Sequence, residues 1–549
     1  MQVSKLIDSI KQYNFIEIDL EGEVLEEEER SVIPFYPRKK RLTVWDLERI
    51  FCHASSNPNI RGILIHVNEL KIGLARAEAI RKSILDLREK GKHIFVYLEG
   101  GGNIEYLISS AASKIYLAPW SVLNLIGLKV EAVFLKDTLD MLGVEAQLKG
   151  IGEYKSAVET FTRNSMSEPN KIMVDSIIED LYKQFVQNIS IGRGVESNTI
   201  RDLIDSGPFT AEEAQGKGLI DNLGYKDDLE SNIRQALNTQ IKKIRSGSLL
   251  KILNFKNFLL NLIGKFKRES ATIAILSHSG IITQGESKGS GAAKTLGSKT
   301  IIRSLTSIAK DQSVKAIILR IMSPGGSGIS SDLIRHHIKV ISEKKPVIVS
   351  MSDVAASGGY LIALGARKIV AEPFTLTGSI GIISGKFNLE GMYKRIGVIK
   401  ESVKRGENAL IYTSFKGFTR EEDDYLTKIM RSMYDQFVKM VSEYRGIELE
   451  TASGLAKGRV WTGRQAKENS LVDELGGLEE AIRLAKKEAG IPEEQVPLVK
   501  FISKPKGIQI SPLGKGMDLI GPFESFINLF QELDRDLVLA LMPFWISIR

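Results

Sequence analysis

The chain has 549 residues, of which 43% are hydrophobic and 26% charged, proportions typical of a folded protein with several domains. Its net charge of +8 is the small difference between 75 basic and 67 acidic residues mixed along the chain, so we expect no nucleic-acid partner. Cys52 is the single cysteine, which excludes an intrachain disulfide, a cysteine zinc site and a cysteine redox pair.

The first residues, MQVSKLIDSIKQYNFIEIDLEGEV, carry charges throughout and lack the continuous apolar stretch of a secretory signal. The sequence also has no run of about 18 uncharged apolar residues, the length needed to span a bilayer. We therefore expect a protein that is cytoplasmic or peripherally associated with a membrane.

Strands and helices are expected to alternate in the first half of the chain. GILIHV (62–67) and HIFVYL (93–98) are short apolar runs typical of buried strands, and between them Ala77, Ile80 and Ile84 recur at helical spacing. This alternation predicts an α/β domain of parallel βαβ units with helices covering the sheet.

A basic, leucine-rich segment, residues 246–270, separates the two halves. It contains SLLKILNFKNFLLNLIGKFKRES, with no acidic residue before Glu269. An amphipathic helix of this type can lie on an anionic membrane surface or pack against a neighbouring domain, and we expect one of these two placements.

The second half repeats the alternation of the first. AIILRI (316–321) and PVIVSM (346–351) are strand-like, and residues 328–344 have the pattern of a helix. In open parallel sheets, ligands bind beyond the carboxyl ends of the strands. The loops after these strands, MSPGGSG and SDVAASGG, are therefore where chemistry is expected. Residues 501–549 form a tail that we predict to be an interface element, from its apolar residues Phe523, Phe526, Leu529 and Phe530.

An internal repeat relates the two halves. At an offset of 254 residues, identical pairs include Tyr106 with Tyr360, Pro119 with Pro373 and Gly127 with Gly381. At an offset of 252 residues, they include Tyr182 with Tyr434, Arg193 with Arg445 and Asp221 with Asp473. We predict two homologous domains, residues 1–245 and 271–500.

The two glycine-rich loops have the residue types that amide hydrolysis requires. Ser357 can present a hydroxyl nucleophile at a strand-to-helix turn, and the Gly358 N–H begins the helix on the same side. Gly325 or Gly326 can supply a second N–H, because glycine lets the backbone approach a substrate closely. Each loop is also typical of a plain turn, so the residues alone leave both interpretations open.

The general base is not evident from the residues. None of the six histidines lies in an obvious motif with Ser357, and we expect His336 and His337 to lie on the surface of the 328–344 helix. A lysine is the alternative, provided that burial lowers its pKa towards neutrality. The pattern alone does not choose among the many lysines.

Four short motifs, in order along the chain, resemble the signal peptide peptidase A family in its long, tandem-domain form. They are GEYKSAVETF (152–161), SPGGSG (323–328), AASGGY (355–360) and LTGSIGI (376–382). That family consists of serine proteases with a Ser-Lys dyad. The resemblance implies a crotonase-like fold related to the Clp protease proteolytic subunit, in two tandem homologous domains.

The resemblance also implies a role for each motif residue. Ser357 is the implied nucleophile, Lys155 the general base and Ser379 the hydroxyl that orients the lysine, while Gly326 and Gly358 are the implied oxyanion donors. It further implies peptide substrates such as signal peptides, a homo-oligomer that is tetrameric in the tandem form, and peripheral membrane contact. No cofactor or metal is expected.

The internal repeat supports a composite site in a different way. Ser357 aligns with Asn103, Gly326 with Ile72, and Lys155 with Ala409, so each half lacks what the other has. Such complementary loss is what one site built from both halves would leave. The competing base is Lys404, which lies close to the aligned position and would make the second half self-sufficient.

Two other functions remain open from the sequence. A crotonase-type acyl-CoA enzyme would share the fold and the oxyanion glycines but would not need Ser357 or Lys155. A non-catalytic scaffold of a membrane complex would need neither the serine nor the lysine.

Overall fold

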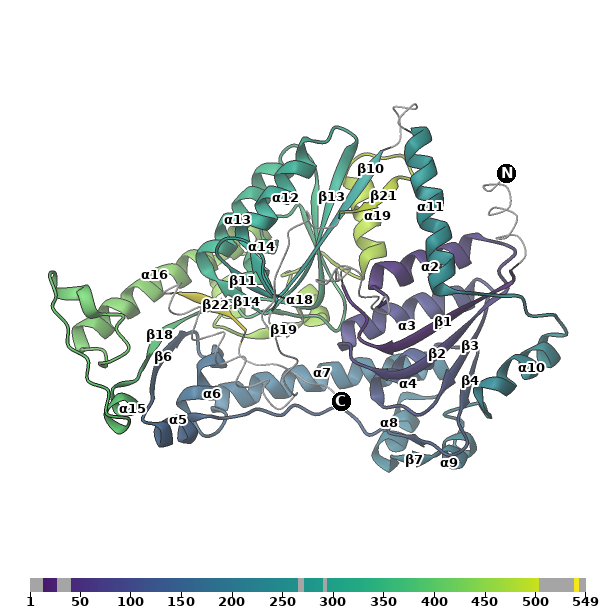
Figure 1. Ribbon diagram of the computed structural model, residues 1–549, viewed down its shortest axis with the longest axis horizontal. Coiled ribbons are helices and arrows are strands. Elements are labelled where there is room, and N and C mark those ends of the chain that lie inside the picture. Colours follow the sequence, from purple (N-terminus) through teal and green to yellow (C-terminus); the bar gives the residue numbers. More distant parts are fainter. Residues whose placement is uncertain (1–12, 27–40, 265–270, 290–293, 503–537, 543–549) are drawn as a thin grey trace. The chain divides into compact units, whose positions relative to one another are not determined.

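The computed structural model describes residues 13–26, 41–264, 271–289, 294–502 and 538–542 (Figure 1). Contacts within the chain define two compact units. Among the described residues, unit 1 contains those within 1–129 and 179–264, and unit 2 contains those within 130–178 and 271–542. The segment 130–178 belongs to the first half of the sequence, but it is part of unit 2.

Unit 1 is built on a parallel six-stranded sheet with the order β8-β4-β3-β2-β1-β9. Its strands are β1 (Phe15–Gly22), β2 (Gly62–Leu70), β3 (His93–Leu98), β4 (Lys114–Leu117), β8 (Asn222–Leu223) and β9 (Lys243–Arg245). β5 (Val122–Leu123) and β7 (Phe209–Thr210) form a separate pair. Its helices are α2 (Val44–Ser56), α3 (Leu74–Glu89), α4 (Asn103–Ser109), α8 (Ser197–Ser206), α9 (Ala211–Gly216), α10 (Lys226–Leu237) and α11 (Ser246–Gly264).

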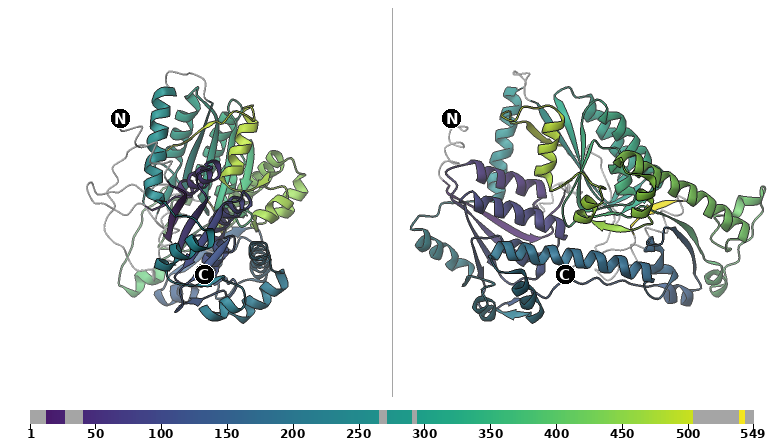
Figure 2. Two further views of the ribbon diagram at one scale, coloured as in Figure 1. Left: turned by 90° about the vertical axis from the view of Figure 1, so that its right-hand side faces the viewer. Right: turned by 180° about the vertical axis from the view of Figure 1, so that it is seen from behind.

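The first sheet of unit 2 repeats this design. The main order of its strands is β19-β17-β15-β13-β10-β21. In addition, β16 pairs with β15, and β20 pairs with β16. The strands are β10 (Thr272–Ser279), β13 (Val314–Ser323), β15 (Val347–Ala356), β16 (Lys368–Ala371), β17 (Leu376–Gly378), β19 (Val460–Thr462), β20 (Glu474–Leu475) and β21 (Leu498–Phe501). Figures 1 and 2 show α12 (Ser298–Lys310) and α13 (Gly328–Ser342) on one face of this sheet and α19 (Leu478–Glu488) on the other.

A second sheet of unit 2 has the order β12-β11-β14-β22-β18-β6 and joins segments that are far apart in sequence. Its strands are β6 (Glu145–Ile151), β11 (Ile281–Thr283), β12 (Thr295–Gly297), β14 (Gly325–Ser327), β18 (Ile382–Asn388) and β22 (Leu539–Leu541). β6 pairs antiparallel with β18 along its whole length: Glu145 lies opposite Asn388 at one end, and Ile151 lies opposite Ile382 at the other. This pairing attaches the 130–178 segment to the second half of the chain.

The remaining helices of unit 2 surround these sheets. They are α5 (Lys136–Leu142), α6 (Glu159–Thr162), α14 (Gly358–Ala363), α15 (Glu390–Arg395), α16 (Arg420–Arg445), α17 (Leu449–Leu455) and α18 (Gly463–Glu468). The helix α7 (Glu168–Arg193) begins in this unit, and short 3-10 turns lie at Ser156–Val158 and Glu407–Leu410.

The long helix α16 begins at a capping box, in which the Glu422 N–H donates to Thr419 Oγ1 and the Thr419 N–H donates to Glu422 Oε2. It ends at Gly446 in a left-handed conformation.

Apolar runs in the sequence form the buried strands. Ile317, Leu319, Val347 and Val349 are at most 1% exposed in β13 and β15. Their sheet is covered on both faces, which is why these runs are continuously apolar rather than alternating. The predicted α/β class, with parallel βαβ units, is confirmed.

Contacts at matching positions repeat in the two units. The Tyr106 hydroxyl donates to the Leu219 carbonyl at 2.8 Å, and the Tyr360 hydroxyl donates to the Leu471 carbonyl at 2.9 Å. Arg193 pairs with Asp221 at 3.0 Å, and Arg445 pairs with Asp473 at 2.9 Å. The sequence repeat is therefore also a repeat of individual tertiary contacts.

The predicted linker helix is α11. Leu249 and Leu250 are at most 3% exposed, and the helix contacts α2 and β1. Residues 265–270 of this segment, and Phe523, Phe526, Leu529 and Phe530 of the predicted interface tail, lie outside the described residues. Within the described ranges, no helix is both long and apolar enough to cross a bilayer.

Candidate active site

Ser357 lies at the turn between β15 and α14. Its φ is +55°, in the left-handed region that residues other than glycine rarely adopt. Its N–H donates to the Gly378 carbonyl at 2.7 Å, and its carbonyl accepts from the Leu361 N–H at 2.8 Å. These bonds hold the strained residue between a strand and a helix. Backbone strain of this kind is concentrated at functional sites.

Lys155 contacts Ser357 within unit 2. Its Nζ lies 2.8 Å from Ser357 Oγ, 2.8 Å from the Ser379 carbonyl oxygen and 2.9 Å from Ser379 Oγ. Lys155 is 3% exposed, and both serines are 0% exposed. The first half of the sequence thus contributes an amine to a buried cluster whose hydroxyl groups come from the second half.

Burial controls the ionisation of Lys155. Loss of water around the ammonium group holds the pKa of Lys155 well below its usual 10.5. Across the described ranges, no carboxylate forms an ion pair with Lys155 to oppose this effect. Burial therefore shifts Lys155 towards the neutral amine, which has a free lone pair.

Glycines make room for the stem of Lys155. A Cβ atom at Gly458 would lie 2.6 Å from Lys155 Cβ, and one at Gly381 would lie 3.0 Å from Lys155 Cδ. The Tyr154 N–H also donates to the Lys457 carbonyl at 2.8 Å. The second glycine of LTGSIGI is therefore needed for the close approach of the lysine.

A polar network that the sequence analysis missed holds the segment after Lys155. Glu159 Oε2 accepts from the Asn170 side chain at 2.9 Å and from the Ser167 N–H at 3.1 Å. The Ser156 hydroxyl donates to Asn170 Oδ1 at 3.0 Å. Its only signal in the sequence was Glu159, the second of the two acidic residues in GEYKSAVETF. The network ties the turn at 155–159 to the start of α7.

Ser379 adopts a second strained conformation beside the lysine. Its φ is +51°, and its N–H donates to the Arg459 carbonyl at 2.7 Å. This geometry directs both its carbonyl and its hydroxyl towards Lys155 Nζ.

The two glycine-rich loops meet at the same place. Gly325 and Gly326 have φ values of +111° and +144°. A Cβ atom at Gly326 would lie 2.2 Å from the Ile282 carbonyl oxygen, and one at Gly325 would lie 3.0 Å from the Gly358 nitrogen. Only glycine fits both the backbone conformation and the space. The structure thus brings β14 next to the first residue of α14.

The alternative bases lie elsewhere. Lys404 is exposed, and its Nζ pairs with Glu407 Oε2 at 3.1 Å. In the described part of the chain, no histidine forms a hydrogen bond with Ser357. His336 is exposed on α13, and the His337 ring lies 2.8 Å from the Leu333 carbonyl of the same helix.

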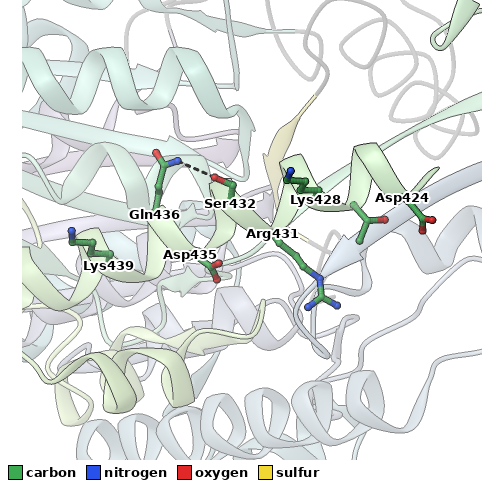
Figure 3. A pocket seen from close by; sticks show the side chains of 8 residues that line it. Asp424, Lys428, Arg431, Ser432, Asp435, Gln436 and Lys439 are labelled. Atoms are coloured by element: carbon green, nitrogen blue, oxygen red, sulfur yellow. Dashed lines mark hydrogen bonds between the residues drawn. The ribbon is translucent and has the colours of Figure 1, made fainter. Parts of the chain in front are cut away.

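A shallow hollow of about 660 Å³ runs along one face of α16 (Figure 3). All the residues that line it come from this helix: Asp424, Thr427, Lys428, Arg431, Ser432, Asp435, Gln436 and Lys439. These residues carry mixed charges and do not converge on a common point, so we assign the hollow no role in chemistry.

Comparison with known proteins decides the family. The model of peptidase family S49 matches residues 86–240 and again residues 339–492, once in each half. This chain belongs to peptidase family S49. The two S49 regions confirm the predicted tandem organisation and the resemblance to the signal peptide peptidase A proteases.

Two proteases are similar to this chain over most of their length. The chain is 33% identical over 495 residues to "Serine protease SPPA, chloroplastic" of Arabidopsis thaliana, covering 90% of this chain and 72% of that protein. It is 32% identical over 464 residues to "Protease 4" of Haemophilus influenzae, covering 82% of this chain and 73% of that protein.

Two solved structures match over a shorter part of the S49 chain. One is a membrane-bound stomatin-specific protease, with 17% identity, a TM-score of 0.27 and coverage of 43% of this chain and 100% of that chain. The other is ClpP1 of Listeria monocytogenes, with 17% identity, a TM-score of 0.26 and coverage of 40% of this chain and 99% of that chain.

Proposed function

We propose that this S49 protease is a serine endopeptidase in which Lys155 is the general base for Ser357, and that it degrades apolar peptides such as cleaved signal peptides. The contact of 2.8 Å between Lys155 Nζ and Ser357 Oγ, in a buried site without a paired carboxylate, carries the proposal. It supports a neutral amine that accepts the serine proton.

The proposed reaction has two stages. The lone pair of neutral Lys155 takes the Ser357 proton as Oγ attacks the substrate carbonyl carbon, and the backbone N–H groups of Gly326 and Gly358 stabilise the oxyanion. Lys155 then gives the proton to the leaving amine, and the acyl group remains on Ser357. A water molecule, deprotonated by the same amine, hydrolyses this ester and restores the serine.

Single substitutions test the dyad. Ser357→Ala and Lys155→Ala should each lower kcat/KM for a fluorogenic apolar peptide by at least about 1,000-fold, since one removes the nucleophile and the other the base. Lys404→Ala is the matched control, because that lysine is exposed and pairs with Glu407, and it should keep full activity. Only chains with Ser357 should react with a phosphonate probe for active serines.

Three results would contradict the proposal. Turnover by Lys155→Ala close to the rate of the unmodified chain would exclude Lys155 as the base. Binding of coenzyme A, with no labelling of Ser357, would favour an acyl-CoA enzyme. Full biological function of both alanine variants would favour a scaffold. The homo-oligomer, the tetramer and the peripheral membrane contact stay predictions.

A further inference from the structure

Residues 457–459, which lie between α17 and β19, contact the backbone on two sides of the proposed catalytic cluster. The Tyr154 N–H, one residue before the proposed base, donates to the Lys457 carbonyl at 2.8 Å. The Ser379 N–H donates to the Arg459 carbonyl at 2.7 Å. A single tripeptide therefore connects the segment of the base to the segment of the hydroxyl that orients it.

The middle residue of this tripeptide packs against the base itself. Gly458 has a φ of +79°, and its N–H donates to the Ile380 carbonyl at 2.8 Å. A Cβ atom at Gly458 would lie 2.6 Å from the Lys155 backbone nitrogen and 2.7 Å from Lys155 Cα. Because glycine has no side chain, the two backbones can lie in direct contact here.

The side chain of Arg459 makes a further connection to the segment of the base. Its guanidinium carbon lies 5.2 Å from the centre of the Tyr154 ring and 4.4 Å from the centre of the Trp461 ring. Its Nη2 donates to Ser176 Oγ of α7 at 3.3 Å. Among the residues that the structure describes, no carboxylate pairs with this guanidinium. The faces of the two aromatic rings are therefore its main contacts.

An ion pair joins the same two segments but is more exposed. Lys457 Nζ lies 3.1 Å from Glu153 Oε1, and the two side chains are 47% and 49% exposed. Exposed ion pairs contribute little to holding a structure in place, because water screens them. Arg459 and Tyr154 are half-buried, so their contact is the stronger of the two connections.

The backbone of the tripeptide is held independently of the Arg459 side chain. Val460, the next residue, lies opposite Gly378 in the pairing of β19 with β17. Its N–H donates to Met173 Sδ at 3.2 Å, and Met173 is 0% exposed. A change of the side chain at position 459 should therefore leave the Arg459 carbonyl in place for its bond with Ser379.

We propose that Arg459 is a positioning residue of the Ser-Lys mechanism: its guanidinium holds Tyr154, and thereby keeps Lys155 Nζ between Ser357 and Ser379. This inference rests on the proposed function. In the described ranges, the guanidinium forms no hydrogen bond with Lys155 or with either serine, so it acts through the backbone that Tyr154 shares with Lys155.

Arg459→Leu tests the inference, because it removes the guanidinium and keeps the backbone. At the pH of highest activity of each chain, kcat for the fluorogenic peptide should fall by about 10- to 100-fold with little change in KM, since the base is displaced while substrate contacts remain. The pH midpoint of kcat/KM should rise, because a loosened Lys155 gains water and its pKa returns towards 10.5.

Arg201→Leu is the matched control. Arg201 lies 5.4 Å from the centre of the Tyr182 ring in unit 1, so the variant loses the same kind of contact away from the cluster. It should keep both kcat and the pH midpoint of the unmodified chain. A loss of kcat or a shift of the midpoint in this control, equal to that in Arg459→Leu, would contradict a specific effect of Arg459.

Variants of Tyr154 test whether Arg459 acts through this ring. Tyr154→Phe keeps the aromatic face and should keep full activity, whereas Tyr154→Leu should reproduce both the loss of kcat and the rise of the midpoint. The double variant with Arg459→Leu should be no less active than the weaker single variant, because both changes break one contact. Tyr154→Leu also tests the contact if Arg459→Leu does not fold.

Four results would overturn the inference while the proposed function stands. A variant that is less stable to heat but keeps its kcat and pH midpoint would make Arg459 merely structural. A higher KM with unchanged kcat would mean that Arg459 binds substrate. Losses that multiply in the double variant would mean that Arg459 does not act through Tyr154. Loss of activity in Tyr154→Phe would assign the effect to the Tyr154 hydroxyl. If Lys155→Ala is fully active, the dyad fails and this inference fails with it.

Discussion

At the scale of single residues, the site depends on which hydrogen bonds Lys155 Nζ donates and which one it accepts. The Ser379 carbonyl, 2.8 Å away, can only accept a hydrogen bond, so it must receive one N–H. A neutral amine has a second N–H, which Ser379 Oγ at 2.9 Å can accept, and one lone pair. The lone pair is then left for the Ser357 hydroxyl. In the proposed mechanism, this assignment makes Ser379 a positioning residue for Lys155.

The activity should depend on pH through Lys155. Only the neutral amine can accept the serine proton, so kcat/KM should rise with pH through the lowered pKa of Lys155 and level off above it. A pH profile of the cleavage of an uncharged apolar peptide measures this dependence. A rate that stays constant down to acid pH would contradict a lysine base.

Lys386 provides the matched control for that profile. It is a second buried lysine, and burial lowers its pKa to about 8, although the Glu422 carboxylate opposes the shift. Its Nζ donates to the Ile411 carbonyl at 2.8 Å, away from Ser357. Lys386→Met should therefore leave the midpoint of the pH profile in place. A shift of the midpoint in this variant would assign the titration to Lys386.

The lowered pKa of Lys155 also predicts a dependence of stability on pH. Between this pKa and 10.5 the unfolded chain binds a proton that the folded chain lacks, so falling pH favours unfolding. Lys155→Met removes this effect. As the pH rises through that interval, the unmodified chain gains stability and the variant does not. The free energy of unfolding of the variant minus that of the unmodified chain should therefore fall by about 1.4 kcal/mol for each unit of increase in pH.

Denaturant titrations of both chains at several pH values measure this difference. Methionine leaves the Ser379 carbonyl without its donor, which costs about 1–3 kcal/mol at any pH. The slope with pH, rather than the sign of the difference, is therefore the test. Equal pH dependence of the two chains would show that Lys155 stays charged when folded.

At the scale of elements, the site forms where two neighbouring strands end. β13 and β15 pair in parallel, so their carboxyl ends meet at one edge of the sheet. Each is followed by backbone that ordinary residues rarely adopt: Gly325 and Gly326 after β13, and Ser357 after β15. Tertiary contacts must stabilise this strain, which links the geometry of the site to the packing of the sheet.

Gly326→Ala should disrupt the loop that is proposed to stabilise the oxyanion. Its φ of +144° disfavours alanine, and the new methyl group would lie 2.2 Å from the Ile282 carbonyl oxygen, so the loop must shift. A displaced donor should lower kcat by about 100-fold or more. Gly454→Ala is the control, because a Cβ atom there has nothing within 4 Å. Equal kcat values for the two variants would contradict the role of this loop.

The sequence allowed the sheet of each unit and the meeting of the two glycine-rich loops to be predicted, because apolar runs and glycine clusters carry a local signal. The second sheet of unit 2 was not predicted. β14 and β22 have only three residues each, too few for a hydrophobic period, and their pairing depends on tertiary contacts. For the same reason the pairing of Gly326 in β14 with Ala540 in β22 had no signal in the sequence.

At the scale of the whole molecule, the unequal use of the two repeats is the main feature. Residues 145–151 of the first half form β6 and pair with β18, whereas the aligned residues 399–405 of the second half form no strand and are exposed. The two halves have therefore kept the same sheet but use this segment differently. Unit 2 depends on a segment from the other half for the position of Lys155.

Phe161→Ala should weaken the packing of residues 130–178 within unit 2 while unit 1 stays folded. The Phe161 ring packs edge-on against Phe387 of β18, with 5.7 Å between ring centroids, and Phe161 is 6% exposed. Loss of a buried phenylalanine costs about 3–5 kcal/mol. This loss should loosen residues 136–162, and a displacement of Lys155 by about 1 Å should lower kcat/KM by about 100-fold.

Hydrogen exchange and kinetics together measure this effect. In Phe161→Ala, amide protection should fall in β6 and α6 but persist in β1 to β4 of unit 1, because the lost contact lies within unit 2. Ile172→Ala, at a position 49% exposed on α7, should change neither protection nor activity. Full activity of Phe161→Ala would mean that β6 pairing alone positions Lys155. Loss of protection in β1 to β4 would instead mean that both units unfold together, because a loosening confined to unit 2 would leave the strands of unit 1 protected.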